Sequence, residues 1–415
     1  MRQRTIRLEA APDLNHVCRG DGVLFVRDGV GVAGRGVAAT GTADEMATVL
    51  AALSSGRDSS HAGSSGAGPS ERDTGAVAVG LVPFLPGADT RFVIPEFIVS
   101  KHPDGTAAAT LVSPDEAGLS DTAFAAALAD ARATRPPRPA VNGFKVAPAT
   151  PVEKYLDAVT GARDAVRSGS LDKVVVARDI EVLAEDPIDV HAVLLRLRAS
   201  FGSSYRYCVG DMIGASPELL VAVDGRSVRS HPLAGTAPRT GDRDTDARLA
   251  AELIASTKNQ VEHRVVIDMV RDTLLPHCSY LDWEAEPSIV AVANVQHLGT
   301  EIEGALSEPS PSVMDLVRML SPTPALGGHP SREAIDFIVS HEPMERGWYG
   351  GAVGWFDAHG NGQFAVTIRC AQMSRDRRSA RLFAGGGIVA ESDPLAELAE
   401  TQAKFQAMLS AIVRA

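Results

Sequence analysis

The chain has 415 residues, of which 45% are hydrophobic and 22% charged, and its formal net charge at pH 7 is −12. Nucleic acid is a poor partner for so acidic a chain, because phosphate binding depends on clustered lysine and arginine. No apolar run reaches membrane-spanning length, so we expect neither nucleic acid nor a membrane as a partner. A small anionic substrate remains compatible, since it needs only a local positive patch or a metal ion.

The N-terminus and the cysteines bear on the compartment. The first seven residues are basic, but no apolar segment follows them as a signal peptide would require. The four cysteines are far apart and lack metal-ligand spacing; they are Cys18, Cys208, Cys278 and Cys370. We therefore expect buried reduced thiols and a cytoplasmic protein. No long heptad or large apolar edge demands a partner subunit, so we expect a monomer.

The N-terminal part, residues 1–140, has mainly strand patterns. Val23–Val26 and Val30–Val37 flank Asp28-Gly29, which predicts a β-hairpin. Residues 54–73 are rich in Ser and Gly and predict a flexible surface loop. Two more strands are predicted over Val77–Leu85 and Phe92–Val99. They contain Pro83 and Pro95, so we expect them at sheet edges or bulges.

A proline-rich break at 135–139 precedes the second part, residues 145–415, where helix and strand patterns alternate. The patterns predict a helix over Val152–Val166, a strand over Lys173–Ile180, strands over 205–213 and 218–223, and an interrupted helix over 245–275.

The C-terminal elements have the strongest signals. Asn361-Gly362 lies between two strand patterns, Trp348–Phe356 and Gln363–Met373, and predicts a hairpin. A third strand follows over Arg381–Val389, and Asp393-Pro394 predicts the start of a helix that runs nearly to the end. Long antiparallel strands mixed with helices predict an α+β fold.

Several charged residues in this second part stand where a hydrophobic core would not favour them. Glu397, Glu400 and Lys404 share one face of the last predicted helix, and paired carboxylates can ligate Mg²⁺. A buried Lys173 at the mouth of its strand could serve as a general base. Burial of Glu218 would raise its pKa and suit it to proton donation. Each residue alone is more simply explained as a solvent-facing charge.

Taken together, the segments resemble the chorismate-utilising enzymes, which include isochorismate, salicylate, anthranilate and aminodeoxychorismate synthases. The resemblance covers roughly residues 150–410, and the N-terminal part matches only loosely. The matching segments are KVVVAR (173–178), GASPELL (214–220), PLAGTAPR (232–239), STKNQVEH (256–263), VQHLGT (295–300), SPTPALGG (321–328), ERGWYGGAVGW (345–355), TIRC (367–370) and AGGGIVAESDPLAELAETQAKF (384–405).

The resemblance implies a single large domain of two stacked, largely antiparallel sheets flanked by helices. It also implies Mg²⁺ as cofactor, held by Glu262 and Glu400 with Glu397 supporting through water, and chorismate as substrate. Arg369 and Tyr349 would hold the enolpyruvyl carboxylate, with His297 on the pyruvyl side of the ring. Small residues and their backbone would line the ring and carboxylate sites, namely Gly235, Thr236, Gly385, Gly386 and Gly387. Lys404 would lie close by.

The branch of the family depends on a few positions. Relatives that add ammonia typically lack a lysine at the position of Lys173, so its presence implies water as the nucleophile and Glu218 as the acid. Ala325 and Ile368, with Leu326, resemble the branch that releases isochorismate, because salicylate synthases tend to have threonine and leucine at the first two positions. Asn259 departs from the glutamate found in some salicylate synthases.

The sequence therefore predicts an isochorismate synthase, an isomerase of menaquinone or siderophore biosynthesis. A salicylate synthase is the main alternative. An ammonia-using anthranilate-type synthase and a catalytically silent chorismate-binding protein are the others. Strict strand alternation would place Ile368 and Arg369 on opposite faces, so both can line one pocket only at a strand end or bulge.

Overall fold

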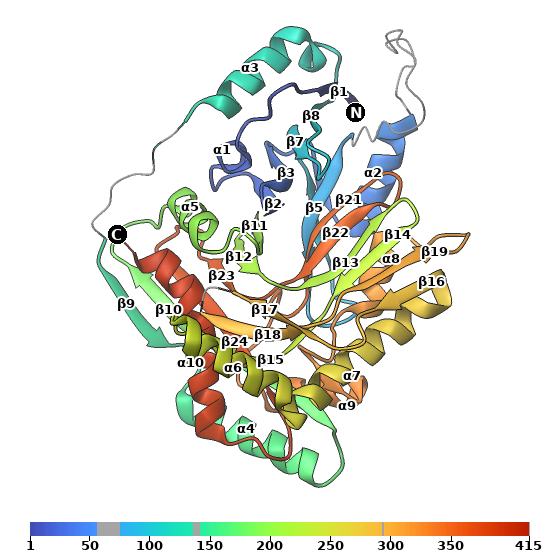
Figure 1. Ribbon diagram of the computed structural model, residues 1–415. Coiled ribbons are helices and arrows are strands. Elements are labelled where there is room, and N and C mark those ends of the chain that lie inside the picture. The colour runs from blue at the N-terminus through green and yellow to red at the C-terminus, as the bar shows by residue number, and fades with distance from the viewer. Residues whose placement is uncertain (56–74, 135, 137–141, 293, 415) are drawn as a thin grey trace.

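The chain folds into antiparallel sheets whose strands come from both halves of the sequence (Figure 1). In this computed structural model the described residues are 1–55, 75–134, 136, 142–292 and 294–414. β5 (Val77–Val82) pairs with β21 (Ala352–Asp357), and β2 (Val23–Arg27) pairs with β11 (Tyr205–Val209). The N-terminal part therefore belongs to the same α+β domain as the rest, as predicted.

Among the described residues, the strands form two large sheets and one small sheet. The first large sheet has the order β1 (Arg2–Arg7), β8 (Ala107–Ser113), β7 (Phe97–Lys101), β3 (Val30–Arg35), β2, β11, β12 (Met212–Ser216), β23 (Cys370–Met373), β24 (Ser379–Ile388), β10 (Lys173–Ala184) and β20 (Gly328–His329), with β9 (Phe144–Pro148) also paired to β10. The second has the order β16 (Cys278–Trp283), β19 (Ile302–Leu306), β14 (Ser227–His231), β13 (Leu219–Asp224), β22 (Gly362–Val366), β21, β5, β6 (Arg91–Ile94) and β4 (Ala39–Gly41). The small sheet consists of β15 (Leu233–Pro238), β18 (Val295–Gly299) and β17 (Ser288–Ala291).

The helices cover the outer faces and one end of the sheets. Helices α4, α6, α7, α9 and α10 gather at one end, close to the small sheet (Figure 1). The helix bounds are α1 Leu14–Cys18, α2 Ala43–Ser55, α3 Asp121–Arg132, α4 Val152–Arg167, α5 Val190–Ser200, α6 Arg243–Ala255, α7 Thr257–Leu274, α8 Val313–Leu320, α9 Ser331–His341 and α10 Pro394–Val413, with 3-10 turns at Ala117–Leu119 and Leu275–His277. None of the helices in the described ranges is long and apolar enough to cross a bilayer.

The main core lies between the two large sheets. It contains aromatic side chains from both, including Phe25, Tyr207, Phe92 and Phe364, all of which are almost fully buried. A second core lies between the outer face of the first sheet and helices α1, α3, α5 and α10. Burial on both faces explains why central strands such as β5 are apolar at every position.

Two of the places where the chain crosses from one large sheet to the other lie side by side. The first crossing, at Pro217-Glu218, leads from β12 to β13, and the second, at 367–369, leads from β22 to β23. The Val366 amide donates to the Glu218 carbonyl at 3.1 Å, which joins the crossings. Polar side chains lie next to these crossings, among them Glu218 and Arg369.

Most sequence predictions of single elements are confirmed. The hairpin at Asp28-Gly29 has both residues at positive φ, 50° and 79°. The hairpin before Gly362 is present, and the helix predicted over 245–275 is interrupted at Ser256, which caps α7. Helix α10 starts where Asp393-Pro394 predicted.

Three predictions need correction. The proline positions do not lie on sheet edges, because β5 ends before Pro83 and Pro95 divides one predicted strand into β6 and β7, which are both internal. The predicted strand 205–213 is a hairpin, since Gly210 turns the chain at φ 59°. Cys278 is only half-buried, whereas the other three cysteines are buried, and all four are free thiols. The loop predicted at 54–73 lies outside the described residues, except for Ser54 and Ser55 in α2.

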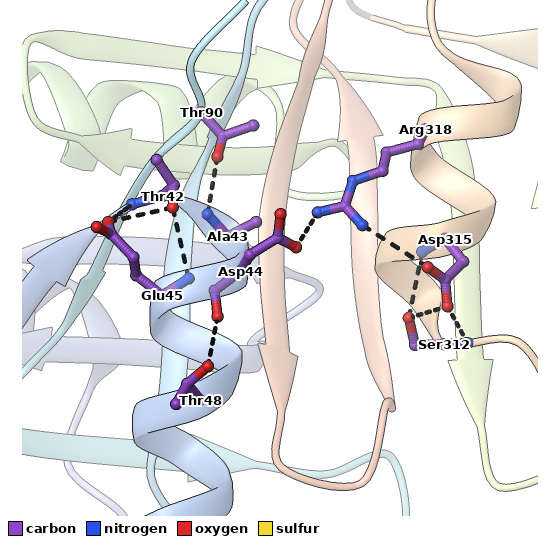
Figure 2. Close-up of polar contacts among 9 residues, drawn as sticks. All are labelled: Thr42, Ala43, Asp44, Glu45, Thr48, Thr90, Ser312, Asp315 and Arg318. Carbon is purple, nitrogen blue, oxygen red and sulfur yellow. Dashed lines mark hydrogen bonds and ion pairs between the residues drawn. The ribbon is translucent and has the colours of Figure 1, made fainter. Parts of the chain in front are cut away.

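An ion pair joins helices α2 and α8, which both pack on strands of the second sheet. Figure 2 shows Arg318 of α8 contacting Asp44 in the first turn of α2. Thr42 and Glu45 satisfy backbone and side-chain donors at the start of α2, and Ser312 with Asp315 forms a capping box on α8. Acidic residues in the first turn are also favoured by the helix dipole.

The contribution of a helix cap to stability can be tested at the start of α10. Asp393 accepts a hydrogen bond from the Ala396 amide at 2.9 Å. Asp393→Ala is expected to lower the free energy of unfolding by about 1 kcal/mol, because the amide loses its partner. Urea denaturation measures the change, with Glu391→Ala as an exposed neighbouring control. Equal unfolding midpoints for the two variants would contradict this role of Asp393.

Candidate active site

A polar cavity lies beside these two crossings. Besides the crossings, its wall is formed by strands of the first large sheet and of the small sheet, by helices α7 and α10, and by the turns that contain Ala325, Leu326 and Tyr349. It holds about 80 Å³ of free volume, because charged side chains extend into it. The wall consists of Lys173, Val175, Pro217, Glu218, Leu233, Ala234, Gly235, Thr236, Lys258, Asn259, Glu262, His297, Ala325, Leu326, Tyr349, Ile368, Arg369, Gly385, Gly387, Glu397, Glu400 and Lys404. All the site residues predicted from the sequence are brought together here, except Gly386.

Lys173 lies at the start of β10 and is buried. Its Nζ is 2.7 Å from Oε1 of Glu262, which α7 supplies from the opposite wall. Gly387 makes room for this contact, because a Cβ atom there would lie 2.5 Å from the Glu262 oxygen and 2.7 Å from Lys173 Cε. The lysine is therefore held in the cavity, away from bulk water.

Glu218, at the first crossing, is a fully buried carboxyl group. Burial raises its pKa to about 8, although the hydrogen bond from the Leu233 amide and the positive charges of Lys173 and Arg369 oppose the shift. The Leu233 amide donates to Oε1 at 3.4 Å. Glu218 is consequently protonated at neutral pH and can donate a proton into the cavity.

Arg369 lies at the second crossing, where the strand pattern breaks. The residue has a φ of 49°, and β22 and β23 end on either side of it. This break lets Ile368 and Arg369 both line the cavity, which strict alternation would forbid. The condition stated from the sequence, a strand end or bulge at this point, is therefore met.

His297 is fixed next to Arg369. Its Nδ1 is 2.9 Å from the Gly235 carbonyl, and its Nε2 is 3.0 Å from an Arg369 nitrogen. Because a guanidinium can only donate, Nε2 is the acceptor and Nδ1 carries the proton. Burial and the charge of Arg369 lower the His297 pKa to about 3, so the ring is neutral and orients the guanidinium.

The side of the cavity near Arg369 contains Tyr349, Ala325 and Leu326. The Tyr349 ring stacks on Phe383 with centroids 5.4 Å apart, and burial raises the pKa of its hydroxyl. Ala325 and Leu326 belong to a turn in which the Leu326 and Gly327 amides bond the Thr323 carbonyl. An aromatic hydroxyl next to a guanidinium is a suitable place for a carboxylate.

The three glycines of β24 do not all face the cavity. Gly385 and Gly387 line it, whereas Gly386 does not, and a Cβ atom at Gly386 would lie 2.7 Å from Oε2 of Glu397 in α10. The period of two in a strand explains this exception. Lys404 donates from Nζ to the Gly385 carbonyl at 2.8 Å and thereby reaches the cavity from α10.

The predicted metal ligands are three carboxylates in the wall of the cavity, Glu262, Glu397 and Glu400. Glu400 pairs with Lys404 at 2.6 Å, and Glu397 accepts a hydrogen bond from Ser392 at 2.7 Å. Burial and the charge of Glu400 raise the pKa of Glu397. In the described part of the chain no three His, Cys, Asp or Glu side chains converge as a preformed metal site. The donor set still suits Mg²⁺, which prefers carboxylate oxygen and would relieve the repulsion between Glu397 and Glu400.

Sequence reasoning omitted several wall residues. Lys258 lies one helical turn before Glu262, and its Nζ is 3.9 Å from Glu397. This i, i+4 spacing was the available signal. Asn259, which the sequence analysis named only as a departure from a glutamate, packs against Gly235, and its side chain bonds Ser256 at the start of α7. Ala234 and Pro217 gave no chemical signal in the sequence.

Known proteins resemble this chain in sequence and in fold. Residues 77–413 match the family described as chorismate binding enzyme. MenF of Mycobacterium tuberculosis is 45% identical over 275 residues, 63% of this chain and 74% of that protein. Isochorismate synthase DhbC of Bacillus subtilis is 39% identical over 280 residues, 65% of this chain and 70% of that protein. The solved structure of DhbC from Bacillus anthracis is 30% identical with a TM-score of 0.78, covering 96% of this chain and 98% of that one. The chain belongs to the chorismate binding enzyme family.

Proposed function

We propose that this chain is an isochorismate synthase, an isomerase that converts chorismate to isochorismate with Mg²⁺ as cofactor. The observation that carries the proposal is the buried pair Lys173 and Glu218 in the wall of one cavity. The cavity thus contains a lysine suited to be a base and a carboxyl group with a pKa of about 8 suited to be an acid. The name of the Bacillus subtilis relative, isochorismate synthase DhbC, agrees with this chemistry.

The reaction adds one water and releases another. Lys173, as the base, takes a proton from a water molecule as the water oxygen forms a bond to C2 of the ring. The two ring double bonds shift, the bond from C4 to its hydroxyl breaks, and Glu218 protonates the departing oxygen. Substrate and product are therefore isomers, and proton exchange with solvent resets the lysine and the carboxyl group.

Binding groups on both sides of the ring would orient chorismate between the base and the acid. Arg369, oriented by His297, and Tyr349 would hold the enolpyruvyl carboxylate. Glu262 and Glu400 would hold Mg²⁺, with Glu397 supporting through water. When bound, the ion would neutralise and anchor the ring carboxylate.

Ala325, Leu326 and Ile368 favour release of isochorismate over further elimination of pyruvate, on the resemblance to that branch. A salicylate synthase is the second candidate, because it would share Lys173 and the carboxylates. The protein would work as a monomer. A location in the cytoplasm is in keeping with its four free cysteines.

The raised pKa of Glu218 predicts a descending limb in the pH profile. The acid must carry its proton, so kcat/KM is expected to fall as pH rises through about 8, the pKa of Glu218 in the free protein. Measuring kcat/KM from about pH 6 to about pH 10 tests this expectation, because kcat/KM reports the pKa values of the free enzyme. A value of kcat/KM that is flat over this range would contradict Glu218 as the proton donor.

Product analysis tests the function itself. Purified protein is incubated with chorismate, with and without Mg²⁺, and the products are separated by chromatography. Isochorismate that forms only with the metal, without pyruvate, is the expected result. Salicylate with pyruvate would favour the second candidate, an ammonium-dependent aromatic amine would indicate an anthranilate-type synthase, and unchanged chorismate would indicate a silent binding protein.

A further inference from the structure

A buried ion pair lies directly behind the cavity wall, between α9 and β21. Arg346 donates from Nε to Oε1 of Glu342 at 2.8 Å and from Nη2 to Oε2 at 2.6 Å. Both side chains are only 2% exposed. Neither residue lines the cavity.

The same guanidinium also binds two backbone segments that do line the cavity. Nη1 donates to the Leu326 carbonyl at 2.6 Å, and Nη2 donates to the Val175 carbonyl at 2.9 Å. Glu342 in turn accepts from the Ala177 amide at 3.0 Å. The pair thus ties the turn with Ala325 and Leu326 to strand β10, two residues beyond Lys173.

The aromatic neighbours of Arg346 extend this link. Its guanidinium lies over the Phe84 ring at 4.2 Å from the centroid and near the Tyr349 ring at 5.9 Å. One side chain therefore contacts three parts of the site framework: the base strand, the 323–327 turn and the Tyr349 segment.

Stability alone is a weak explanation for such a pair. Taking two charges out of water costs several kcal/mol per ion, and an apolar pair of similar volume is often equally stable. The bidentate pair of Arg346 and Glu342 is better suited to fixing the relative positions of the backbone segments that it bonds, because the planar guanidinium donates in set directions.

We infer that Arg346, held by Glu342, is a positioning residue that sets the distance between the Lys173 strand and the Ala325-Leu326 wall. This inference rests on the proposed function and extends it, because the distance decides how the ring is presented to the base. The wall from the 323–327 turn also contains the residues that resemble the isochorismate-releasing branch. A loosened turn should therefore affect both rate and product.

The conservative variant Arg346→Lys tests the inference. An ammonium can keep a charge contact with Glu342 but cannot serve both backbone carbonyls in the same directions. We expect the turnover number to fall between about tenfold and a hundredfold, with a much smaller change in KM, because misplacement by about 1 Å costs that much. Pyruvate should appear as a minor product.

A double variant separates positioning from folding. Arg346→Met with Glu342→Leu replaces the pair by apolar side chains and avoids an unpaired buried charge, but the two carbonyls and the Ala177 amide lose their partners. Urea unfolding measures the folded fraction of this variant, and we expect a low turnover number per folded protein. The matched control is Arg19→Lys, another buried arginine, which pairs with Asp130 at 3.0 Å far from the cavity wall. It is expected to change stability and leave turnover unchanged.

The outcomes distinguish the two levels of the proposal. If the wild-type protein forms isochorismate and the Arg346→Lys variant has the same turnover number, the positioning role alone is overturned. A loss of rate in the double variant that matches its loss of folded protein would also overturn that role alone. A wild-type protein that forms no isochorismate would overturn the proposed function and this inference with it.

Discussion

Lys173→Ala is expected to lower isochorismate formation by about 10²- to 10⁴-fold, the contribution of a general base to such a reaction. Water attacking C2 must lose a proton, and Lys173 is the buried amine that starts β10 at the cavity wall. Steady-state rates with chorismate and Mg²⁺ measure the loss. Thermal unfolding of the same samples shows whether the fold is kept.

The substitution also leaves Glu262 without its lysine, so folding needs its own control. Lys173→Met keeps most of the side-chain volume, and it should lose turnover to the same extent. Lys154→Ala, an exposed lysine in α4, should change neither rate nor stability. Rates within a few-fold of wild type for either Lys173 variant would refute the base assignment.

Glu218→Gln is expected to remove turnover, again by about 10²- to 10⁴-fold, while chorismate affinity changes little. The amide has almost the same shape and can donate a hydrogen bond, but it cannot release a proton to the departing hydroxyl. Calorimetric titration with chorismate measures binding separately from the rate.

Glu303→Gln, an exposed glutamate on β19, is the matched control for Glu218→Gln. It should behave as wild type in both measurements. A Glu218→Gln variant that retains substantial turnover would show that the C4 oxygen obtains its proton elsewhere. The descending limb of the wild-type pH profile near 8 should then also have another origin.

Local signals made much of the fold predictable. Asp28-Gly29 and Asp393-Pro394 each act within a few residues, through positive φ or through capping, and both predictions are confirmed. The site was predictable for a different reason. Its charged residues lie in short segments unlike a core, and their resemblance to one family indicated that distant segments meet.

The remaining features depend on long-range pairing. The break that turns Arg369 into the cavity requires the chain to cross between two sheets, and no residue from 367 to 369 signals this crossing. The strands next to Pro83 and Pro95 are internal because of the strands that pair beside them, and this pairing is not visible in the local sequence. Glu342 and Arg346 resemble an ordinary i, i+4 surface pair in sequence, and only burial behind the wall distinguishes them.

Isotope incorporation tests the central claim most directly. The protein is incubated with chorismate and Mg²⁺ in H₂¹⁸O under single-turnover conditions, and the product is analysed by chromatography with mass spectrometry. The account predicts isochorismate with one ¹⁸O atom in the C2 hydroxyl and no pyruvate, because Lys173 activates solvent water. Isochorismate without the label would contradict water addition, and labelled product accompanied by stoichiometric pyruvate would contradict release at the isochorismate stage.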